Sequence, residues 1–244
     1  MGSTADNRYK RGEKHMSTIF QVSDGWKERF RGAQAGILVM RDLSNPASHP
    51  ALDEKRLALE SRLRERYLRS GSPPLQENPI IAAYTDYYRS FGKTYHVKLQ
   101  LESVVFKGKP IVTSSALVQA MFMAELENMI LTAGHDLEKV RPRIRLDVSK
   151  GGERYVLLNG KEQSLKEGDM FMRDEEGIIS SVLYGPDART RILAETREVV
   201  FAVYAPRGIQ REMVLRHLKD IEENVRLFSP NARVEEVTVV TSPP

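Results

Sequence analysis

Short apolar runs separated by turn dipeptides, between Leu157 and Pro206, constrain the fold more than any other feature of this chain. Asn159-Gly160, Glu167-Gly168 and Glu176-Gly177 each place a residue that tolerates positive φ between two strand-like runs. This spacing is typical of successive hairpins. The segment is therefore predicted to be an antiparallel meander.

Further strands are predicted on both sides of this segment. The runs at 143–148 and 154–158 flank Ser149-Lys-Gly-Gly, which indicates a hairpin that leads into the meander. The apolar run at 35–40 is bounded by a glycine and a proline-containing turn, and 234–240 gives the last strand-like run.

Helical spacing dominates the first half of the chain. An amphipathic stripe predicts a helix over 52–68, whose mixed charges indicate solvated surface, with RNA contact as the alternative. An aromatic stripe from Tyr84 to Phe91 follows the helix start at Asn78-Pro79, and we interpret it as core packing, with base stacking as the alternative. Further helices are predicted over 96–106, from Ser114 or Ser115 to Leu131, and over 214–225.

Helices in the first half and strands in the second half predict an α+β fold, with helices packed over a largely antiparallel β-sheet. The opening 16 residues begin with Met-Gly-Ser and lack the apolar stretch of a secretory signal. We interpret 1–16 as an expression leader and expect 17–244 to form a single domain.

Composition narrows the class of protein. The 244 residues include no cysteine, which excludes thiol chemistry and suits a reducing compartment, and no apolar run approaches the length of a membrane span. We therefore expect a cytoplasmic protein that does not bind membranes. Outside the leader, the chain has 33 basic and 31 acidic residues. This near balance of charge argues against tight, sequence-independent binding to a nucleic-acid duplex.

Familiar catalytic motifs are missing. The five histidines are scattered, and no nucleophile elbow, phosphate loop or dinucleotide-binding turn occurs, so no metal and no cofactor are expected. His135-Asp136 is either an acid–base pair or, as we favour, a surface or capping pair. The acidic cluster 174–176 is either a site for a hard cation or, as we favour, a solvated loop.

Gly185 and Thr196 are the remaining candidates for a site. A glycine at a strand end exposes backbone N–H groups to a ligand, and a threonine hydroxyl one strand away offers a single hydrogen bond. The residues alone leave a second interpretation open, in which Gly185-Pro186 is only a turn and Thr196 only begins a strand.

The order of these features resembles a known family. Leu-Asn-Gly-Lys-Glu at 158–162, the acidic cluster at 174–176, an apolar strand up to Gly185, then Glu195-Thr196 and another apolar strand resemble the B3/B4 domain of the phenylalanyl-tRNA synthetase β chain. The resemblance covers roughly 78–205, and its upstream part resembles free-standing B3/B4 proteins. In the synthetase this domain hydrolyses wrongly charged tRNA.

The chain also departs from the family pattern. Tyr184-Gly185 stands where the family has Met-Gly-Gly, and Thr196 is kept. The family's glutamate falls on Ala202, and its pocket histidine falls on Ala133, two residues from His135. The resemblance therefore implies a changed or lost amino-acid specificity.

For function, the resemblance implies a protein associated with tRNA or aminoacyl-tRNA, and as the first candidate a trans-acting deacylase that hydrolyses mischarged aminoacyl-tRNA. Gly185 would supply backbone donors, Thr196 would orient the substrate or a water, and Tyr184 would limit the substrate side chain. Two alternatives stay open: a non-catalytic module that binds tRNA ends or aminoacyl-adenosine-like ligands, and a protein-interaction scaffold.

Overall fold

A computed structural model describes residues 19–69, 71 and 74–244 of the chain. The expected leader at 1–16 lies outside these residues. The α-helices of the described part are α2 (Asp24–Arg29), α3 (Pro50–Leu68), α4 (Pro79–Arg89), α5 (His96–Phe106), α6 (Ala116–Asn128) and α7 (Arg211–Arg226), with short 3-10 helices η1 (Leu75–Glu77) and η2 (Leu137–Lys139).

The strands form two sheets and a separate hairpin. One sheet has five strands in the order β1-β4-β7-β8-β9, the other has four in the order β11-β2-β10-β3, and β5 pairs with β6. All pairings are antiparallel except that of β1 with β4. The strands are β1 (Phe20–Val22), β2 (Gln34–Arg41), β3 (Thr132–Asp136), β4 (Ile144–Val148), β5 (Arg154–Val156), β6 (Glu162–Ser164), β7 (Met170–Arg173), β8 (Ile178–Ser181), β9 (Gly185–Pro186), β10 (Val199–Ala205) and β11 (Arg233–Thr241).

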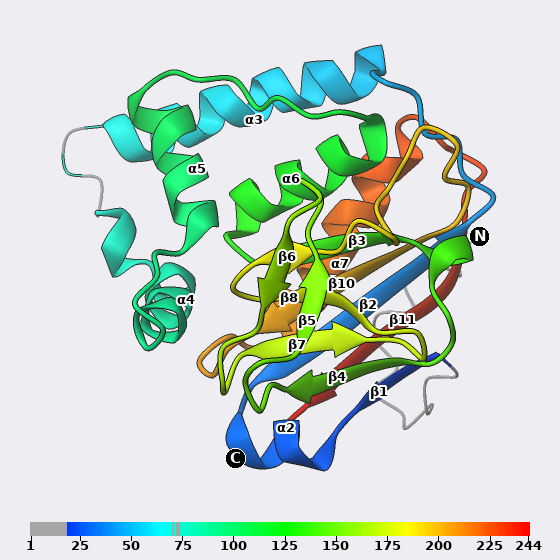
Figure 1. The fold of residues 1–244 in the computed structure, drawn as a ribbon. Coiled ribbons are helices and arrows are strands. Elements are labelled where there is room, and N and C mark those ends of the chain that lie inside the picture. The colour runs from blue at the N-terminus through cyan, green and yellow to red at the C-terminus, as the bar shows by residue number, and fades with distance from the viewer. Residues whose placement is uncertain (1–18, 70, 72–73) are drawn as a thin grey trace.

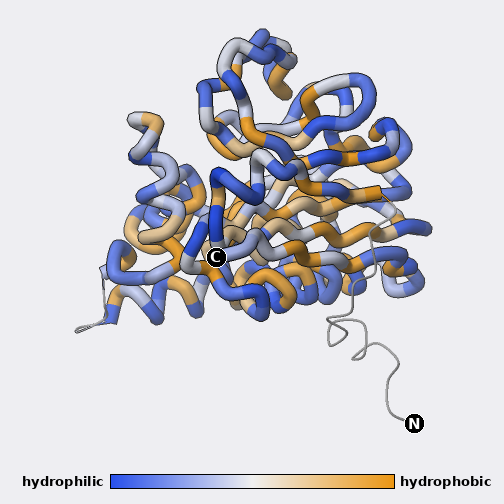
Figure 2. Tube along the Cα trace, turned by 90° about the horizontal axis from the view of Figure 1, so that it is seen from below, coloured by the Kyte–Doolittle hydropathy of each residue, from blue (hydrophilic) through white to orange (hydrophobic). Residues whose placement is uncertain are grey.

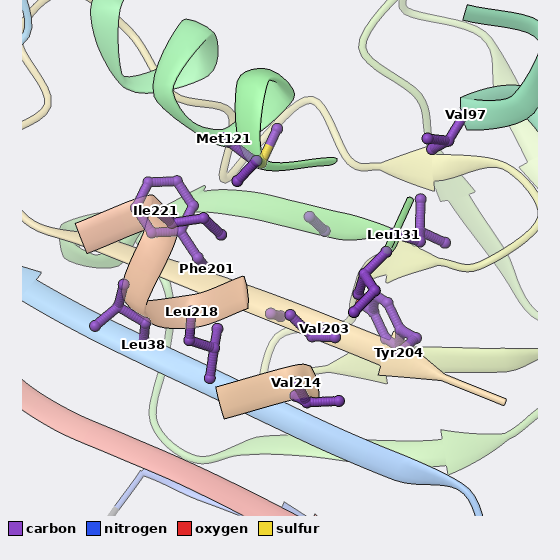
Figure 3. Close-up of a cluster of buried hydrophobic side chains, with 14 of the residues drawn as sticks. Leu38, Val97, Met121, Leu131, Phe201, Val203, Tyr204, Val214, Leu218 and Ile221 are labelled. Atoms are coloured by element: carbon purple, nitrogen blue, oxygen red, sulfur yellow. The ribbon is translucent and has the colours of Figure 1, made fainter. Parts of the chain in front are cut away.

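Helices α6 and α7 lie on one face of the four-stranded sheet (Figure 1). Phe201 of β10 faces Leu218 and Ile221 of α7 in an apolar layer (Figure 3). The approach is close at Gly36 of β2, where an added Cβ would lie 2.9 Å from Val214. Glycine at position 36 therefore lets α7 pack directly against the sheet.

The opposite face of the four-stranded sheet meets the five-stranded sheet. A hydrogen bond between the hydroxyls of Tyr204 (β10) and Ser180 (β8) joins the two sheets. The β5–β6 hairpin crosses the outer side of the five-stranded sheet (Figure 1), where Tyr155 and Leu165 pack with Phe171 in a small separate cluster. Apolar residues follow the strands through the interior, and hydrophilic residues gather in the turns (Figure 2).

The fold is α+β, as the sequence predicted, and the expected helices are present. Helix α6 ends three residues earlier than expected, because Met129 adopts a left-handed conformation with φ of 60° and the chain then enters β3. The sequence analysis missed β3 because its five residues, Thr132–Asp136, closely follow the helix and contain no apolar run.

The predicted meander is partly wrong. Asn159-Gly160 and Glu176-Gly177 do turn hairpins, β5–β6 and β7–β8. The expected hairpin around Ser149-Lys-Gly-Gly does not form, because β4 pairs with β1 and β7 whereas β5 pairs only with β6. Gly151 and Gly152 have φ of 91° and 89°, so the chain changes direction and leaves the sheet there. Glu167-Gly168 joins the hairpin to β7 and turns no hairpin of its own.

Candidate functional site

Tyr184 and Gly185 lie in the turn that joins β8 to β9, at the edge of the five-stranded sheet. The predicted strand ends earlier than expected, at Ser181, and Gly185 begins β9 and pairs with Ser181. The Tyr184 N–H donates to the Ser181 hydroxyl at 3.2 Å, and the Tyr155 hydroxyl donates to the Gly185 carbonyl at 2.9 Å. These contacts fix the backbone of the turn.

Gly185 is required by the backbone conformation rather than by lack of space. Its φ is 85°, a value that L-residues rarely adopt, and no heavy atom lies within 4 Å of the position that a Cβ would take. The backbone of Gly185 is thus open on that side, which leaves room for a ligand group to approach.

A cation lies over the Tyr184 ring. The Nζ atom of Lys93, in the turn between α4 and α5, is 4.5 Å from the ring centroid. The ring is partly buried and packs on the cluster of Tyr155 and Phe171. Burial raises the pKa of the Tyr184 hydroxyl, and the Asp169 charge adds to the rise. An aromatic ring with an adjacent ammonium therefore forms part of the surface here.

Asp169 lies beneath this turn and is a residue that sequence reasoning missed. Its fully buried carboxylate accepts hydrogen bonds from Tyr87 at 2.7 Å and from Ser181 at 2.6 Å. Burial raises the pKa of Asp169 to about 6, and these hydrogen bonds limit the rise. The only sequence signal was an aspartate between a turn glycine and an apolar run.

Thr196 occupies a different place. It is fully buried in the turn that precedes β10, where its hydroxyl donates to Asp136 at 2.8 Å and accepts from the Leu193 N–H at 2.9 Å. No contact recorded among the described residues joins Thr196 to the turn of Tyr184 and Gly185. The structure thus brings two of the three predicted site residues together at a surface and gives the third a role in holding a turn closed.

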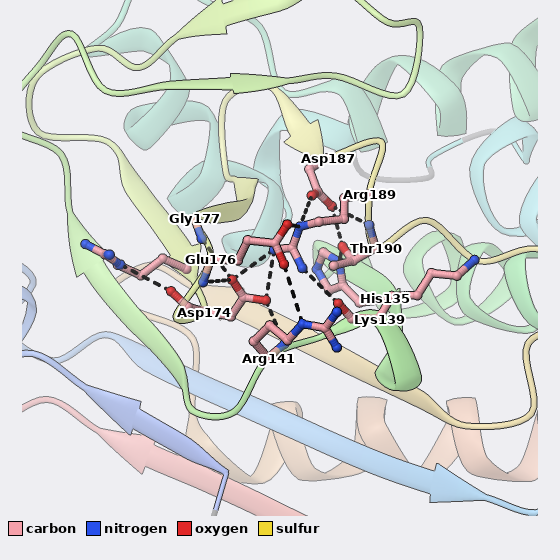
Figure 4. A network of polar contacts seen from close by, with 10 residues as sticks. His135, Lys139, Arg141, Asp174, Glu176, Gly177, Asp187, Arg189 and Thr190 are labelled. Carbon is pink, nitrogen blue, oxygen red and sulfur yellow. Dashed lines mark hydrogen bonds and ion pairs between the residues drawn. The ribbon is translucent and has the colours of Figure 1, made fainter.

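A buried polar network lies between these two places, where the edge strands β3 and β9 meet (Figure 4). The Thr190 hydroxyl donates to Asp187 and lies 2.8 Å from His135 Nδ1. Because the single Thr190 proton goes to Asp187, His135 presents Nδ1–H to Thr190 and keeps Nε2 unprotonated. Burial, together with the charge of Arg189, lowers the pKa of His135 to about 3, so the ring is neutral.

His135 Nε2 has no hydrogen-bond partner among the described residues. The side chain is fully buried, which corrects the expected surface role. Asp136 does act as a cap, because its carboxylate accepts from the Glu138 N–H at the start of η2. The two residues alternate along β3 and are not an acid–base pair.

The acidic cluster at 174–176 also differs from the expected solvated loop. Asp174 is buried, and both of its oxygens accept from Arg189 at 2.9 Å. Burial opposes ionisation, but hydrogen bonds from the Arg141 backbone and from Arg189 hold the pKa of Asp174 below its usual range. Only Glu175 and Glu176 are exposed. Asp174 therefore closes the β7–β8 turn and orients Arg189.

Ala133 and Ala202 are direct cross-strand partners on β3 and β10, and both are buried. These are the positions on which the family's histidine and glutamate fall. The register places them on the same side of the sheet as His135 and Tyr204, toward the five-stranded sheet. This chain therefore has two methyl groups where the resemblance would put a histidine and a glutamate.

Two surface hollows are found elsewhere in the described part. One of about 570 Å³ lies among α3, α4, α6 and α7, and one of about 390 Å³ lies over β1, β4 and β7. Neither includes Tyr184, Gly185 or Thr196. The described residues contain no group of three or more histidine or acidic side chains arranged to hold a metal ion. Within the same residues, no helix is both long and apolar enough to cross a membrane.

Comparison with protein families matches residues 87–225 to the B3/4 domain. The match covers more than half of the chain, and the chain belongs to the B3/4 domain family. Among curated proteins, no match is found. Among solved structures, the chain is similar to an N-terminal fragment of the phenylalanyl-tRNA synthetase beta-subunit from Pyrococcus horikoshii, with 13% identity and a TM-score of 0.46. The similarity covers 95% of this chain and 56% of that fragment.

Proposed function

We propose that this protein binds the aminoacylated end of a tRNA at the turn of Tyr184 and Gly185. The observation that carries the proposal is the Tyr184 ring at a sheet edge with the Lys93 ammonium 4.5 Å from its centroid. The 3′ end of a tRNA is single-stranded, and proteins bind single strands by stacking bases on aromatic rings and placing cations near phosphates. Membership of the B3/4 domain family supports a role connected with tRNA.

The turn offers features suited to such a ligand. Gly185 leaves its backbone open on one side, which allows a ligand carbonyl to approach closely. Tyr184 fills space next to it and would exclude a large substrate side chain. The fixed backbone of this turn gives a ligand a preformed surface rather than one that must be ordered on binding.

Hydrolysis of a mischarged ester is the second candidate. An aminoacyl ester is already activated, so a backbone that polarises its carbonyl and a positioned water would accelerate hydrolysis without a nucleophilic side chain. In this proposal Gly185 supplies the polarising backbone, and Thr196 acts through the turn that it closes. Recognition ranks first because Ala133 and Ala202 supply no acid or base.

The test combines retention of labelled aminoacyl-tRNA and uncharged tRNA with a deacylation panel of mischarged tRNAs. The proposal expects charged tRNA to be retained more tightly than uncharged tRNA. Lys93→Gln should weaken retention severalfold. It should also lower the slope of log affinity against log salt by about 1, the loss expected for one phosphate contact. Lys55→Gln, which removes a charge from the distant helix α3, is the matched control and should change neither.

The panel separates the candidates. Ester release above the spontaneous rate for any pair assigns hydrolysis, whereas retention without release leaves recognition alone. Equal failure to retain charged tRNA, uncharged tRNA and aminoacyl-adenosine analogues would contradict the proposal and leave a protein-interaction scaffold.

A further inference from the structure

Three arginines gather on the outer side of the five-stranded sheet. Arg145 of β4 and Arg173 of β7 are direct cross-strand partners, and Gln21 of β1 continues the same row. Arg143 lies just before β4 and lines the same surface hollow. These four residues, here called the arginine row, line the hollow of about 390 Å³ together with Asp174 and Glu175.

The charges of the arginine row are only partly compensated, by Glu175 in the hollow and by Asp24 and Asp147 near Arg145. The contact of Arg145 with Asp147 is loose at 3.8 Å, and Arg173 reaches only the backbone carbonyl of Asp174 at 3.5 Å. Arg143 has no recorded ion pair with any described residue. All three arginines are exposed, so they are accessible to a ligand. The Asp174 carboxylate that lines the hollow is already bonded at both oxygens to Arg189.

Like charges directly opposite one another destabilise a sheet. Arg62 and Arg66, by contrast, share the carboxylate of Glu127. The arginine row instead sets guanidinium groups side by side across neighbouring strands, about 4.8 Å apart at the backbone. Planar guanidinium groups bind phosphate oxygens in a bidentate manner, and an anion would remove the repulsion between them.

We propose that the arginine row binds the phosphodiester backbone of RNA. This inference rests on the proposed function, because the row and the turn of Tyr184 and Gly185 belong to one sheet, and it assigns the row the sequence-independent contacts. Up to three phosphates are bound, one by each arginine. Such a small footprint agrees with the nearly neutral balance of the chain outside residues 1–16.

The test measures how the binding of uncharged tRNA to the full chain depends on salt. Each phosphate contact contributes roughly 0.7 to 0.9 to the slope of log affinity against log salt. Replacing all three arginines by glutamine (R143Q/R145Q/R173Q) should lower the slope by about 2 and weaken binding at low salt roughly a hundredfold. The lysine version, R143K/R145K/R173K, keeps the charges and should retain most of the slope.

A matched control removes the same charge at helices α3 and α4 and at the residue after α3: R62Q/R69Q/R89Q should leave the slope near its original value. The glutamine variant of the row should melt no lower than the original protein, since it relieves repulsion, and this separates lost binding from lost folding. An unchanged slope in the row variant, or an equal loss in the control, would overturn the inference. Equal affinity for polyglutamate would also overturn it in favour of an acidic peptide.

Uncharged tRNA keeps this test distinct from the proposed function. Failure of end recognition would abolish the preference for charged tRNA and leave the slope difference in place. If the arginine row does not bind phosphates, the original protein and the glutamine variant will have the same salt slope, while the preference for charged tRNA will remain.

Discussion

The two faces of the four-stranded sheet contrast sharply in chemistry. The face toward α6 and α7 is apolar at its centre, with Phe201 and Leu38 packed on Leu218 and Ile221, and its buried His217 is hydrogen-bonded to Thr132. The face toward the five-stranded sheet adjoins His135 and Thr190, which are buried and polar. Burying polar groups costs free energy unless they are hydrogen-bonded. The helix face therefore stabilises the fold. The buried polar groups where the two sheets meet instead hold the nearby surface turn in position.

The largest effect is expected on the helix face. Phe201→Ala should lower the free energy of unfolding by about 3–5 kcal/mol, because it leaves a cavity in a fully packed layer. Urea denaturation measures the loss, and the exposed Leu158→Ala should change it by less than about 0.5 kcal/mol. If the folded fraction of Phe201→Ala also lost tRNA affinity by a similar free energy, the separation of a stabilising face from a binding surface would be contradicted.

Asp169 makes the polar side sensitive to pH. Its pKa is raised to about 6 in the folded state from an ordinary value of 3.8, so the folded state holds the proton between these values. Stability from this group is complete below pH 3.8 and is lost as the pH rises through 6, by about 3 kcal/mol. Unfolding free energies measured between pH 4 and 7 should fall less steeply in Asp169→Asn. Parallel profiles for the two proteins would contradict the assignment.

Thr196→Val sharpens the role of the turn before β10. Removing the hydroxyl leaves a buried Asp136 oxygen with one donor fewer, which should cost about 1–3 kcal/mol of unfolding free energy. Thr196→Ser keeps the hydroxyl and should recover most of the loss in the same thermal or urea measurement. If valine were tolerated without loss of stability but reduced ester release, Thr196 would belong to the site directly.

Gly185→Ala should have the smallest effect on stability, roughly 1 kcal/mol, because an L-residue at a φ of 85° is strained although no atom blocks its Cβ. Gly177→Ala is the matched control, since that glycine has neither positive φ nor a neighbour within 4 Å of the added Cβ. A loss well above this value would mean that the open side of Gly185 is structurally occupied.

Short sequence patterns correctly predicted the features that depend only on neighbouring residues. Helix starts such as Asn78-Pro79 and turns such as Asn159-Gly160 appear in the structure because capping and positive φ depend on a few neighbouring residues. The pairing of β1 with β4 and the separation of β4 from β5 depend on contacts between distant segments, and no short motif records them.

In the candidate site, too, the sequence predicted what adjacent residues determine and missed what distant segments bring together. Tyr184 and Gly185 are adjacent in sequence and share one turn, so their proximity was predictable. Asp169 reaches that turn through Ser181 and Tyr87, which are separated from it along the chain. The arginine row could not be predicted either, because Arg145 and Arg173 become neighbours only through the register of β4 and β7.

The most direct test of the account compares the affinity for charged tRNA of the original protein with that of Tyr184→Ala and Tyr67→Ala. Both variants remove a partly buried tyrosine, one at the proposed surface and one on α3. Stacking of a base is worth about 1–3 kcal/mol, so the dissociation constant should rise roughly tenfold or more for Tyr184→Ala and stay unchanged for Tyr67→Ala. Equal dissociation constants for all three proteins would contradict binding at this turn.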